Sequence, residues 1–285
     1  MAGITTAPER SLLAVMLSRR IVALALAFLM MIVGIAVFGP ALFSLDPAAM
    51  SVRQRLTPPG VAYWLGSDAF GRDVLSRLVH AGRVSLLIGA GVALAASAAG
   101  IVIGLLAGFY RRLDGPLSRL IDSMMAFPDI LLAISLVAIL GGSVINVIIA
   151  LSIVYTPRIA RIVRASTLVV RELPYVEAAH ALGSSTIYIL TRHVLLNISS
   201  PIIVQATFIF AYAMLAEAGL SFLGVGVDPA TPTWGTMINE GRQFIDRSLY
   251  LILFPGLAIS FSVLSLQLLG DGLRDALDPK IARQM

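Results

Sequence analysis

The residue types that most often carry catalysis or bind metals are sparse in this chain and lie far apart. There is no cysteine, which excludes disulfides, thiolate metal sites and cysteine nucleophiles. The three histidines, His80, His180 and His193, are too widely spaced to suggest a ligand cluster. The single lysine, Lys280, follows a proline, so the chain has no GxxxxGK[ST] phosphate-binding loop. We therefore predict no metal site, no cofactor and no ATP site of that kind.

The composition is typical of a membrane protein. Hydrophobic residues make up 58% of the 285 residues and charged residues only 13%, against about 25% in soluble domains. In so apolar a chain the formal net charge of +5 indicates basic loops beside a membrane rather than nucleic-acid binding. A soluble enzyme, a disordered chain and a fibrous chain are all excluded.

Runs without charge that could cross the hydrocarbon core, about 20 apolar residues each, recur along the chain. They cover 21–45, 84–110, 130–157, 194–227 (interrupted only by Glu217) and 248–270. The first run is too long for the core of a signal peptide and lacks a convincing cleavage site. We therefore expect a retained first transmembrane helix at 21–43, preceded by a cytoplasmic segment at 1–20.

The third run leaves two interpretations open, one span or two. As two spans, 120–140 and 143–163, it brings the total to six and puts two thirds of the basic residues on the inner side. As one span, it puts most of them outside. The positive-inside rule thus favours an all-α membrane protein with six transmembrane helices and both termini cytoplasmic. An external loop at 44–83 and five spans within 84–281 follow from this reading.

Several residues in the spans carry structural expectations. Pro128 and Pro255 are expected to kink the third and sixth spans, since each removes a backbone donor. Gly100, Gly104 and Gly108 repeat every four residues and predict a close helix contact, either within the chain or with another subunit.

Charged residues inside the spans are expected near span ends or beside partners. Four of them lie toward the inner ends of two spans: Asp122 and Asp129 near the start of the third, and Arg158 and Arg161 near the end of the fourth, where long side chains can snorkel. Glu217 lies deep in the fifth span, where a charge costs roughly 2.5–3.5 kcal/mol. Two interpretations stay open: Glu217, with Ser221, lies on the translocation pathway or a subunit interface, or it makes a structural hydrogen bond.

The cytoplasmic loop at 158–195 is predicted to contain two short helices joined by a sharp bend. Pro174 suits the first turn of a helix, and Glu177 and the two alanines after it favour helix. Gly183 can end this helix in the left-handed conformation, and Ser184 or Ser185 can cap the next one. The feature is either a structured loop or a docking element for a soluble partner.

These residues resemble the EAA loop of ABC importer membrane subunits: Glu177-Ala-Ala, three residues, Gly183, then His193-Val-Leu-Leu-Asn. Four further stretches are similar, in order, to the C-type subunit of the dipeptide, oligopeptide and nickel importers. They are LGSDAFGRDVLSR at 65–77, LAEAGLSFLG at 215–224, WGTMINEG at 234–241 and GDGLRDALDP at 270–279. The chain departs from the family at Leu196, where the family usually has proline, so the geometry of the second short helix stays open.

The resemblance gives eight signature residues without assigning them a role: Gly66, Asp68, Gly71, Arg72, Asp73, Asp271, Arg274 and Asp278. It also implies a set of residues that couple the chain to an ATPase: Pro174, Tyr175, Glu177, Ala178, Ala179 and Gly183. In this set Glu177 would make polar contacts with the ATPase, the two alanines would allow close packing, and Gly183 would set the turn.

The resemblance implies the type I importer architecture and a pore-forming permease subunit in the bacterial cytoplasmic membrane. The solute would be a dipeptide, an oligopeptide or a similar small solute such as a nickel complex or glutathione. Two separate cytoplasmic ATPase subunits would hydrolyse ATP, so this chain would not be an enzyme. A second, homologous permease subunit would complete the pore, an extracytoplasmic binding protein would deliver the solute, and lipid would surround the spans.

Two other classes of function are weighed against this one. A stand-alone ion-coupled carrier is disfavoured because ionisable residues in the spans are few and no inverted repeat is recognisable. An intramembrane serine protease is disfavoured because the chain has no GxSxG motif, while His180 and His193 fall in the predicted cytoplasmic loop.

Overall fold

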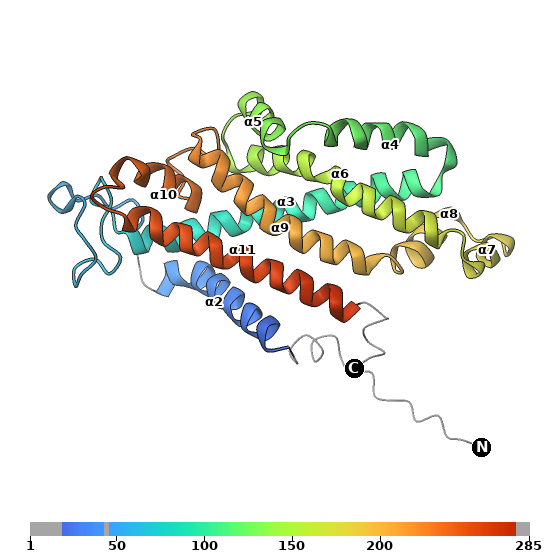
Figure 1. The fold of residues 1–285 in the computed structure, drawn as a ribbon, viewed down its shortest axis with the longest axis horizontal. Helices are drawn as coiled ribbons and strands as arrows, with labels where there is room; N and C mark the ends of the chain where they lie inside the picture. Colours follow the sequence, from blue (N-terminus) through green and yellow to red (C-terminus); the bar gives the residue numbers. More distant parts are fainter. Residues whose placement is uncertain (1–18, 43–45, 278–285) are drawn as a thin grey trace, which may run out of the picture.

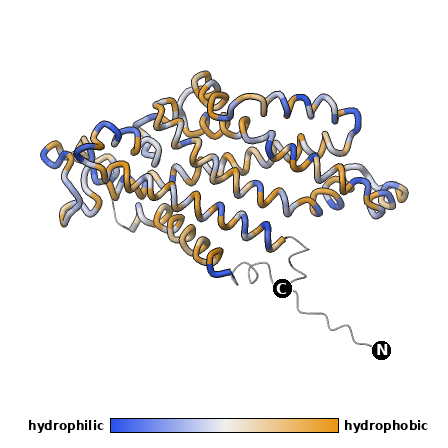
Figure 2. The backbone as a smooth tube through the Cα atoms, in the orientation of Figure 1, coloured by the Kyte–Doolittle hydropathy of each residue, from blue (hydrophilic) through white to orange (hydrophobic). Residues whose placement is uncertain are grey.

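The computed structural model describes residues 19–42 and 46–277, and the described chain is almost wholly helical. Long helices run back and forth along one bundle (Figure 1). Five of them are long and apolar enough to cross a membrane: α2 (Arg20–Leu42), α3 (Val74–Phe109), α6 (Val144–Val170), α9 (Ser199–Phe222) and α11 (Tyr250–Leu277). Figure 2 shows that the middle of this bundle is hydrophobic and that hydrophilic segments gather toward its ends.

The third predicted span is a bent pair of helices, α4 (Arg111–Met125) and α5 (Asp129–Leu140). The two are bent by 91° at the break between them, and counted together they bring the candidate spans to six, the predicted number. The expected kink at Pro128 is therefore a complete break. Pro128 has no backbone N–H to continue α4 and steers the preceding residue out of helical geometry. By contrast, α11 is a single helix that includes Pro255.

Helix α3 begins at Val74, well before the predicted start at residue 84. The prediction relied on uncharged runs, and Arg77 and Arg83 lie in the first turns of the helix. Asp73 caps the helix by accepting from the amides of Leu75 and Ser76. The loop predicted to be external is correspondingly shorter than 44–83, and its described part, which includes the 3-10 turn η1 (Val52–Gln54), ends at Asp73.

The glycine repeat of α3 packs against α6 of the same chain, which decides between the two interpretations given above. A Cβ on Gly100 would lie 2.5 Å from the Cβ of Ile159, and one on Gly104 would lie 2.6 Å from the carbonyl oxygen of Ala160. A Cβ on Gly108 would lie 2.6 Å from the Cβ of Thr167. Backbones this close exclude any larger residue without a shift, so the repeat serves to pack the helices of this chain.

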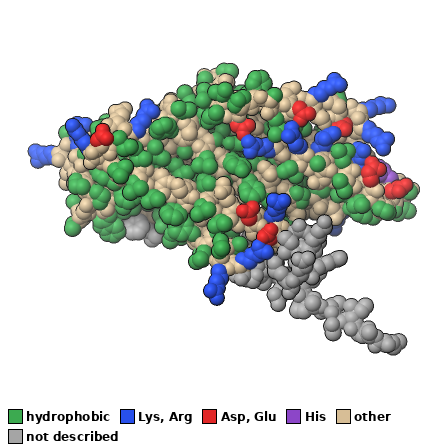
Figure 3. All heavy atoms as spheres, viewed as in Figure 1, with side chains coloured by type: hydrophobic (Ala, Val, Ile, Leu, Met, Phe, Trp, Pro, Cys, Tyr) green, Lys and Arg blue, Asp and Glu red, His purple; other side chains and the backbone are tan. Residues whose placement is uncertain are grey.

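The two ends of the bundle differ in what they carry. One end holds α7 (Pro174–Ala181), α8 (Thr186–Tyr188) and the π-helical turn η2 (Ile189–Leu195). The start of α2 and the end of α11, joined by an ion pair between Arg19 and Asp275, point toward this end but stop short of it (Figure 1). The other end holds the 46–73 loop, α10 (Trp234–Gly241) and the 3-10 turn η3 (Arg242–Phe244). On the face seen in Figure 3, hydrophobic side chains cover the middle, while arginines gather at the left end and over the right half.

Candidate functional site

The predicted helical bend after α6 is present. Helix α6 runs to Val170, and α7 then starts with Pro174 in its first turn. Gly183 follows α7 with a φ of 78°, in the left-handed region that glycine adopts without strain. The side chain of Ser185 accepts from the amide of Tyr188 and caps α8, which leads into η2. The chain therefore reverses direction at Gly183, between two short helical elements.

The inward side of this segment is part of the hydrophobic core. Val176 and Ala179 of α7 are 1% and 8% exposed, and Ile189 and Val194 of η2 are fully buried in the same cluster. The ring of His180 stacks on that of Phe109 at the end of α3, with centroids 5.8 Å apart. These contacts pack the segment against the hydrophobic core near the ends of α3 and α6.

The outward side of the same segment exposes both apolar and polar side chains. Leu182 is 86% exposed, Ile187 75% and Tyr188 50%. We call the exposed set the coupling surface; it consists of Pro174, Tyr175, Glu177, Ala178, Leu182, Ile187 and Tyr188. An apolar patch on a segment that projects from the bundle is typical of a protein-binding surface.

One predicted coupling residue lies elsewhere. Ala178 is exposed on the coupling surface, whereas Ala179 packs inward against the core of its own chain. The next residue on a helix is turned by about 100°, so two adjacent alanines do not share a face. Gly183 is exposed and sets the turn, with no atom within 4 Å of the position its Cβ would take.

Leu196, which stands where the family usually has proline, leaves the backbone helical. Its φ and ψ are −63° and −37°, and its side chain is 54% exposed at the end of η2. The amide of Asn197 donates to Val194, and α9 begins two residues later at Ser199. The second helical element thus passes into the fifth span with only a short irregular turn.

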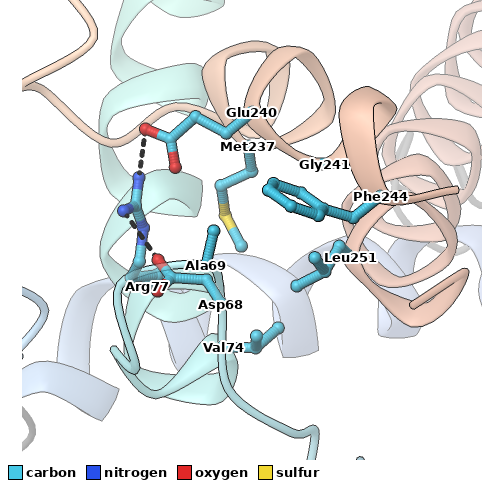
Figure 4. A pocket seen from close by; sticks show the side chains of 9 residues that line it. All are labelled: Asp68, Ala69, Val74, Arg77, Met237, Glu240, Gly241, Phe244 and Leu251. Atoms are coloured by element: carbon cyan, nitrogen blue, oxygen red, sulfur yellow. Dashed lines mark hydrogen bonds and ion pairs between the residues drawn. The ribbon is translucent and has the colours of Figure 1, made fainter. Parts of the chain in front are cut away.

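At the opposite end, four charged side chains form a closed network: Asp68, Arg72, Arg77 and Glu240. Figure 4 shows the part made by Asp68, Arg77 and Glu240. Arg77 donates to Asp68 and to Glu240, each at 3.1 Å, and Arg72 donates to the same two carboxylates, to Glu240 at 2.7 Å. The side chain of Arg77 is only 3% exposed. Burial raises the pKa of Glu240 although the Arg72 guanidinium beside it pulls the pKa down. The network joins the 46–73 loop and the start of α3 to α10.

Two signature glycines shape the loop that brings Asp68 into this network. Gly66 and Gly71 have φ values of 83° and 72°. A Cβ on Gly71 would lie 1.9 Å from the carbonyl oxygen of Ser51, and one on Gly66 would lie 2.6 Å from the ring of Tyr250. Only glycine fits these two positions, both for conformation and for space.

Glu217 is 1% exposed and accepts hydrogen bonds from Ser221 and Thr233, both at 2.8 Å. Thr233 also caps α10, and Ser85 of α3 accepts from the amide of Trp234 at 3.1 Å. The geometry thus gives Glu217 the structural hydrogen bonds of the second interpretation. A place for Glu217 and Ser221 on the pathway or a subunit interface stays a prediction.

The remaining three signature residues lie close together in the sequence, near the C-terminus. Asp271 and Arg274 are exposed on the last turns of α11, and Asp278 lies outside the described residues. Arg158, predicted near the inner end of the fourth span, pairs with Asp129, and α6 continues to Val170, beyond the predicted end of that span at 163. Sequence reasoning also missed Glu240 and Thr233, whose partners belong to other segments.

In the described residues, no group of three His, Asp or Glu side chains could hold a metal ion.

Comparison with known proteins identifies the family. Residues 100–283 match the model of the "binding-protein-dependent transport system inner membrane component". The chain belongs to this family.

Individual relatives cover nearly the whole chain. A putative peptide transport system permease protein of Brucella suis is 47% identical over 93% of this chain and 90% of its own length. The di/tripeptide transport permease DppC of Pseudomonas aeruginosa is 45% identical over 90% of this chain and 87% of its own. The glutathione transport permease GsiD of Pectobacterium atrosepticum is 41% identical over 89% of this chain and 85% of its own.

The chain is therefore a multi-pass inner-membrane permease subunit of an ABC importer. The alternative of a stand-alone ion-coupled carrier is wrong, because members of this family work with an ATPase and a substrate-binding protein. The permease subunit in such a system is not the catalytic component.

Proposed function

We propose that this permease subunit imports dipeptides or oligopeptides, with glutathione or a similar small solute as the neighbouring possibility. The names of its relatives support a peptide: two are peptide or di/tripeptide permeases, and a third carries glutathione, itself a tripeptide. A second, homologous permease subunit completes the pore. Two ATPase subunits bind at the end that carries the coupling surface, which is the inner end.

The observation that carries the proposal is the coupling surface. It combines the exposed side chain of Glu177 with those of Leu182, Ile187 and Tyr188. The other side of the same segment packs into the hydrophobic core. A partner bound there could move the ends of α3 and α6 directly, because α7 and η2 pack against the same hydrophobic cluster as those helices. Closure of the ATPases would thereby switch the spans between outward-facing and inward-facing states. The end that carries the coupling surface, the start of α2 and the end of α11 is then cytoplasmic.

The test is peptide uptake by proteoliposomes that contain the full transporter and its binding protein. Glu177→Ala and Gly183→Asp are each expected to lower ATP-driven uptake at least tenfold while membrane insertion stays normal. Glu172→Ala is the matched control, since Glu172 is exposed on the same loop but lies before α7. Wild-type uptake in both coupling variants would contradict the docking role, and a wild-type complex that imports no peptide would contradict the substrate.

A further inference from the structure

Three ion pairs attach the bent helices α4 and α5 to α6. Their partners run in opposite order along the two segments: Asp114 with Arg164, Asp122 with Arg161, and Asp129 with Arg158. The first two aspartates lie on α4, which starts at the same end as the coupling segment. The third pair is different, because Asp129 opens α5 at the break and Arg158 lies far along α6.

The pair between Asp129 and Arg158 lies at mid-depth of the spans. Arg158 has fourteen residues of α6 before it and twelve after it, which is about 20 Å of helix on either side. Tyr212, near the middle of α9, lies beside Arg158 and gives the same depth independently. Because α6 and α9 exceed a core ~30 Å thick by only about 6–11 Å, both residues lie inside the core wherever the helices sit across it.

This mid-depth pair is partly open. The side chains of Arg158 and Asp129 are 34% and 38% exposed, and Tyr212 is 38% exposed. Charges that face lipid at this depth carry a penalty of several kcal/mol, so such residues usually face a bundle interior or a water-filled passage. The surface made by α5, α6 and α9 at this level therefore faces water or another polar group rather than acyl chains.

Two aromatic rings hold the guanidinium in place. The central carbon of Arg158 lies 5.4 Å from the ring centroids of both Tyr155 and Tyr212. The hydroxyl of Tyr155 donates to the backbone oxygen of Tyr212 at 3.4 Å, which links α6 to α9. Within the described residues Arg158 makes one hydrogen bond, from Nη2 to Asp129, and Asp129 accepts no other. The other N–H donors of the planar Arg158 guanidinium, whose geometry suits a carboxylate, are thus free.

We propose that Asp129 and Arg158 form a subsite for the peptide in transit, in which Arg158 receives the C-terminal carboxylate and Asp129 the N-terminal ammonium group. The proposal rests on the proposed function, since it needs a solute that carries both charges. When the peptide binds, the ion pair between Asp129 and Arg158 is replaced by one ion pair to each end of the peptide, so every charge stays compensated. Such an exchange holds the solute weakly, as passage requires. Tyr155 and Tyr212 orient Arg158, and Tyr212 offers a flat apolar surface beside it.

Arg158→Gln tests the proposal in the reconstituted transporter with its binding protein. Uptake of dialanine and of its C-terminal amide is measured per molecule of loaded binding protein, with each peptide saturating. We expect the variant to lower dialanine uptake about tenfold, as for loss of a charge-assisted bond, and uptake of the amide less than twofold. Saturation-transfer NMR of the two peptides on the purified complex, without binding protein, should show the same loss of preference for the free carboxylate.

The matched control is Arg161→Gln, which removes the next ion pair along α6 and should change neither uptake by more than twofold. The double variant Arg158→Gln/Asp129→Asn removes both charges and leaves two amides that can still pair across α5 and α6. If the pair were only structural, the double variant would restore dialanine uptake; the subsite predicts that uptake stays low. An equal loss for both peptides, or failure of the two permeases to assemble, would overturn the subsite. If the wild type imports neither peptide, the proposed function itself fails.

Discussion

The two ends of the bundle differ in their polar and apolar side chains: one end buries and pairs its charges, and the other exposes apolar surface. At the end that holds the 46–73 loop, which we propose to be the outer end, Arg77 is 3% exposed and its charge is matched by Asp68 and Glu240 from two separate segments. At the inner end, Leu182 and Ile187 are left 86% and 75% exposed beside well-packed helices. The outer end satisfies its polar groups within the chain, whereas the inner end leaves apolar surface that only a partner can cover. Variants at the outer end should therefore affect folding, and variants at the inner end should affect assembly.

The largest effect is expected from Arg77→Ala. The change leaves the buried carboxylate of Asp68 and the partly exposed one of Glu240 with only Arg72 between them, and should cost about 3–5 kcal/mol of stability. Thermal unfolding of the detergent-purified protein measures the loss. Arg53→Ala, an exposed arginine of the same loop, is the control and should change stability by less than about 0.5 kcal/mol. Equal melting temperatures for both variants would contradict the role given to the network.

The next effect is expected from Gly71→Ala, at roughly 2–3 kcal/mol. The new Cβ would meet the backbone of Ser51 at 1.9 Å, and the left-handed backbone would add strain. Gly60→Ala in the same loop is a matched control, because the nearest atom to its Cβ would be 3.9 Å away. The comparison of their melting temperatures is the measurement. A loop that tolerates alanine at 71 as well as at 60 would mean that it can rearrange freely.

A smaller effect, and on assembly alone, is expected from Leu182→Asn. Because the side chain is exposed in the isolated subunit, its stability should not change, while affinity for the ATPase should fall about tenfold. Co-purification with the ATPase at increasing dilution measures this. Val61→Asn, fully exposed in the outer loop, should change neither quantity. A drop in the melting temperature of Leu182→Asn would show that this residue is buried within the chain instead.

The smallest effect is expected from Gly183→Ala, at about 1 kcal/mol. Its φ of 78° is close to that of Gly71, yet no atom lies within 4 Å of the added Cβ, so only the backbone conformation is penalised. The same glycine preference thus has a larger cost at the packed outer end than at the open inner end. A cost for Gly183→Ala that equals or exceeds that of Gly71→Ala would contradict this difference between the two ends.

Local patterns predicted local structure well. The glycine repeat at 100, 104 and 108 predicted the close contact of α3, and Pro174, Gly183 and Ser185 predicted the bend of the coupling segment. The start of α3 could not be read from uncharged runs, because Arg77 is compensated by Glu240, a residue far away in the sequence.

The partner of Arg158 was missed for a related reason. Snorkelling would leave Arg158 without a partner in the chain, but the bend after α4 places Asp129 beside Arg158. A sequence shows which residues carry charge, but only the packed helices show which charges meet. The same limit applies to Glu217, whose partner Thr233 belongs to a different segment.

The central claim, that the coupling surface faces the ATPase inside the cell, is best tested by side-specific labelling. The chain has no cysteine, so Leu182→Cys and Val61→Cys each supply a single thiol. With a membrane-impermeant maleimide, L182C should react only in inverted vesicles and should be protected by bound ATPase, whereas V61C should react only in intact cells. Reaction of L182C in intact cells, or equal labelling of L182C with and without the ATPase, would contradict the account.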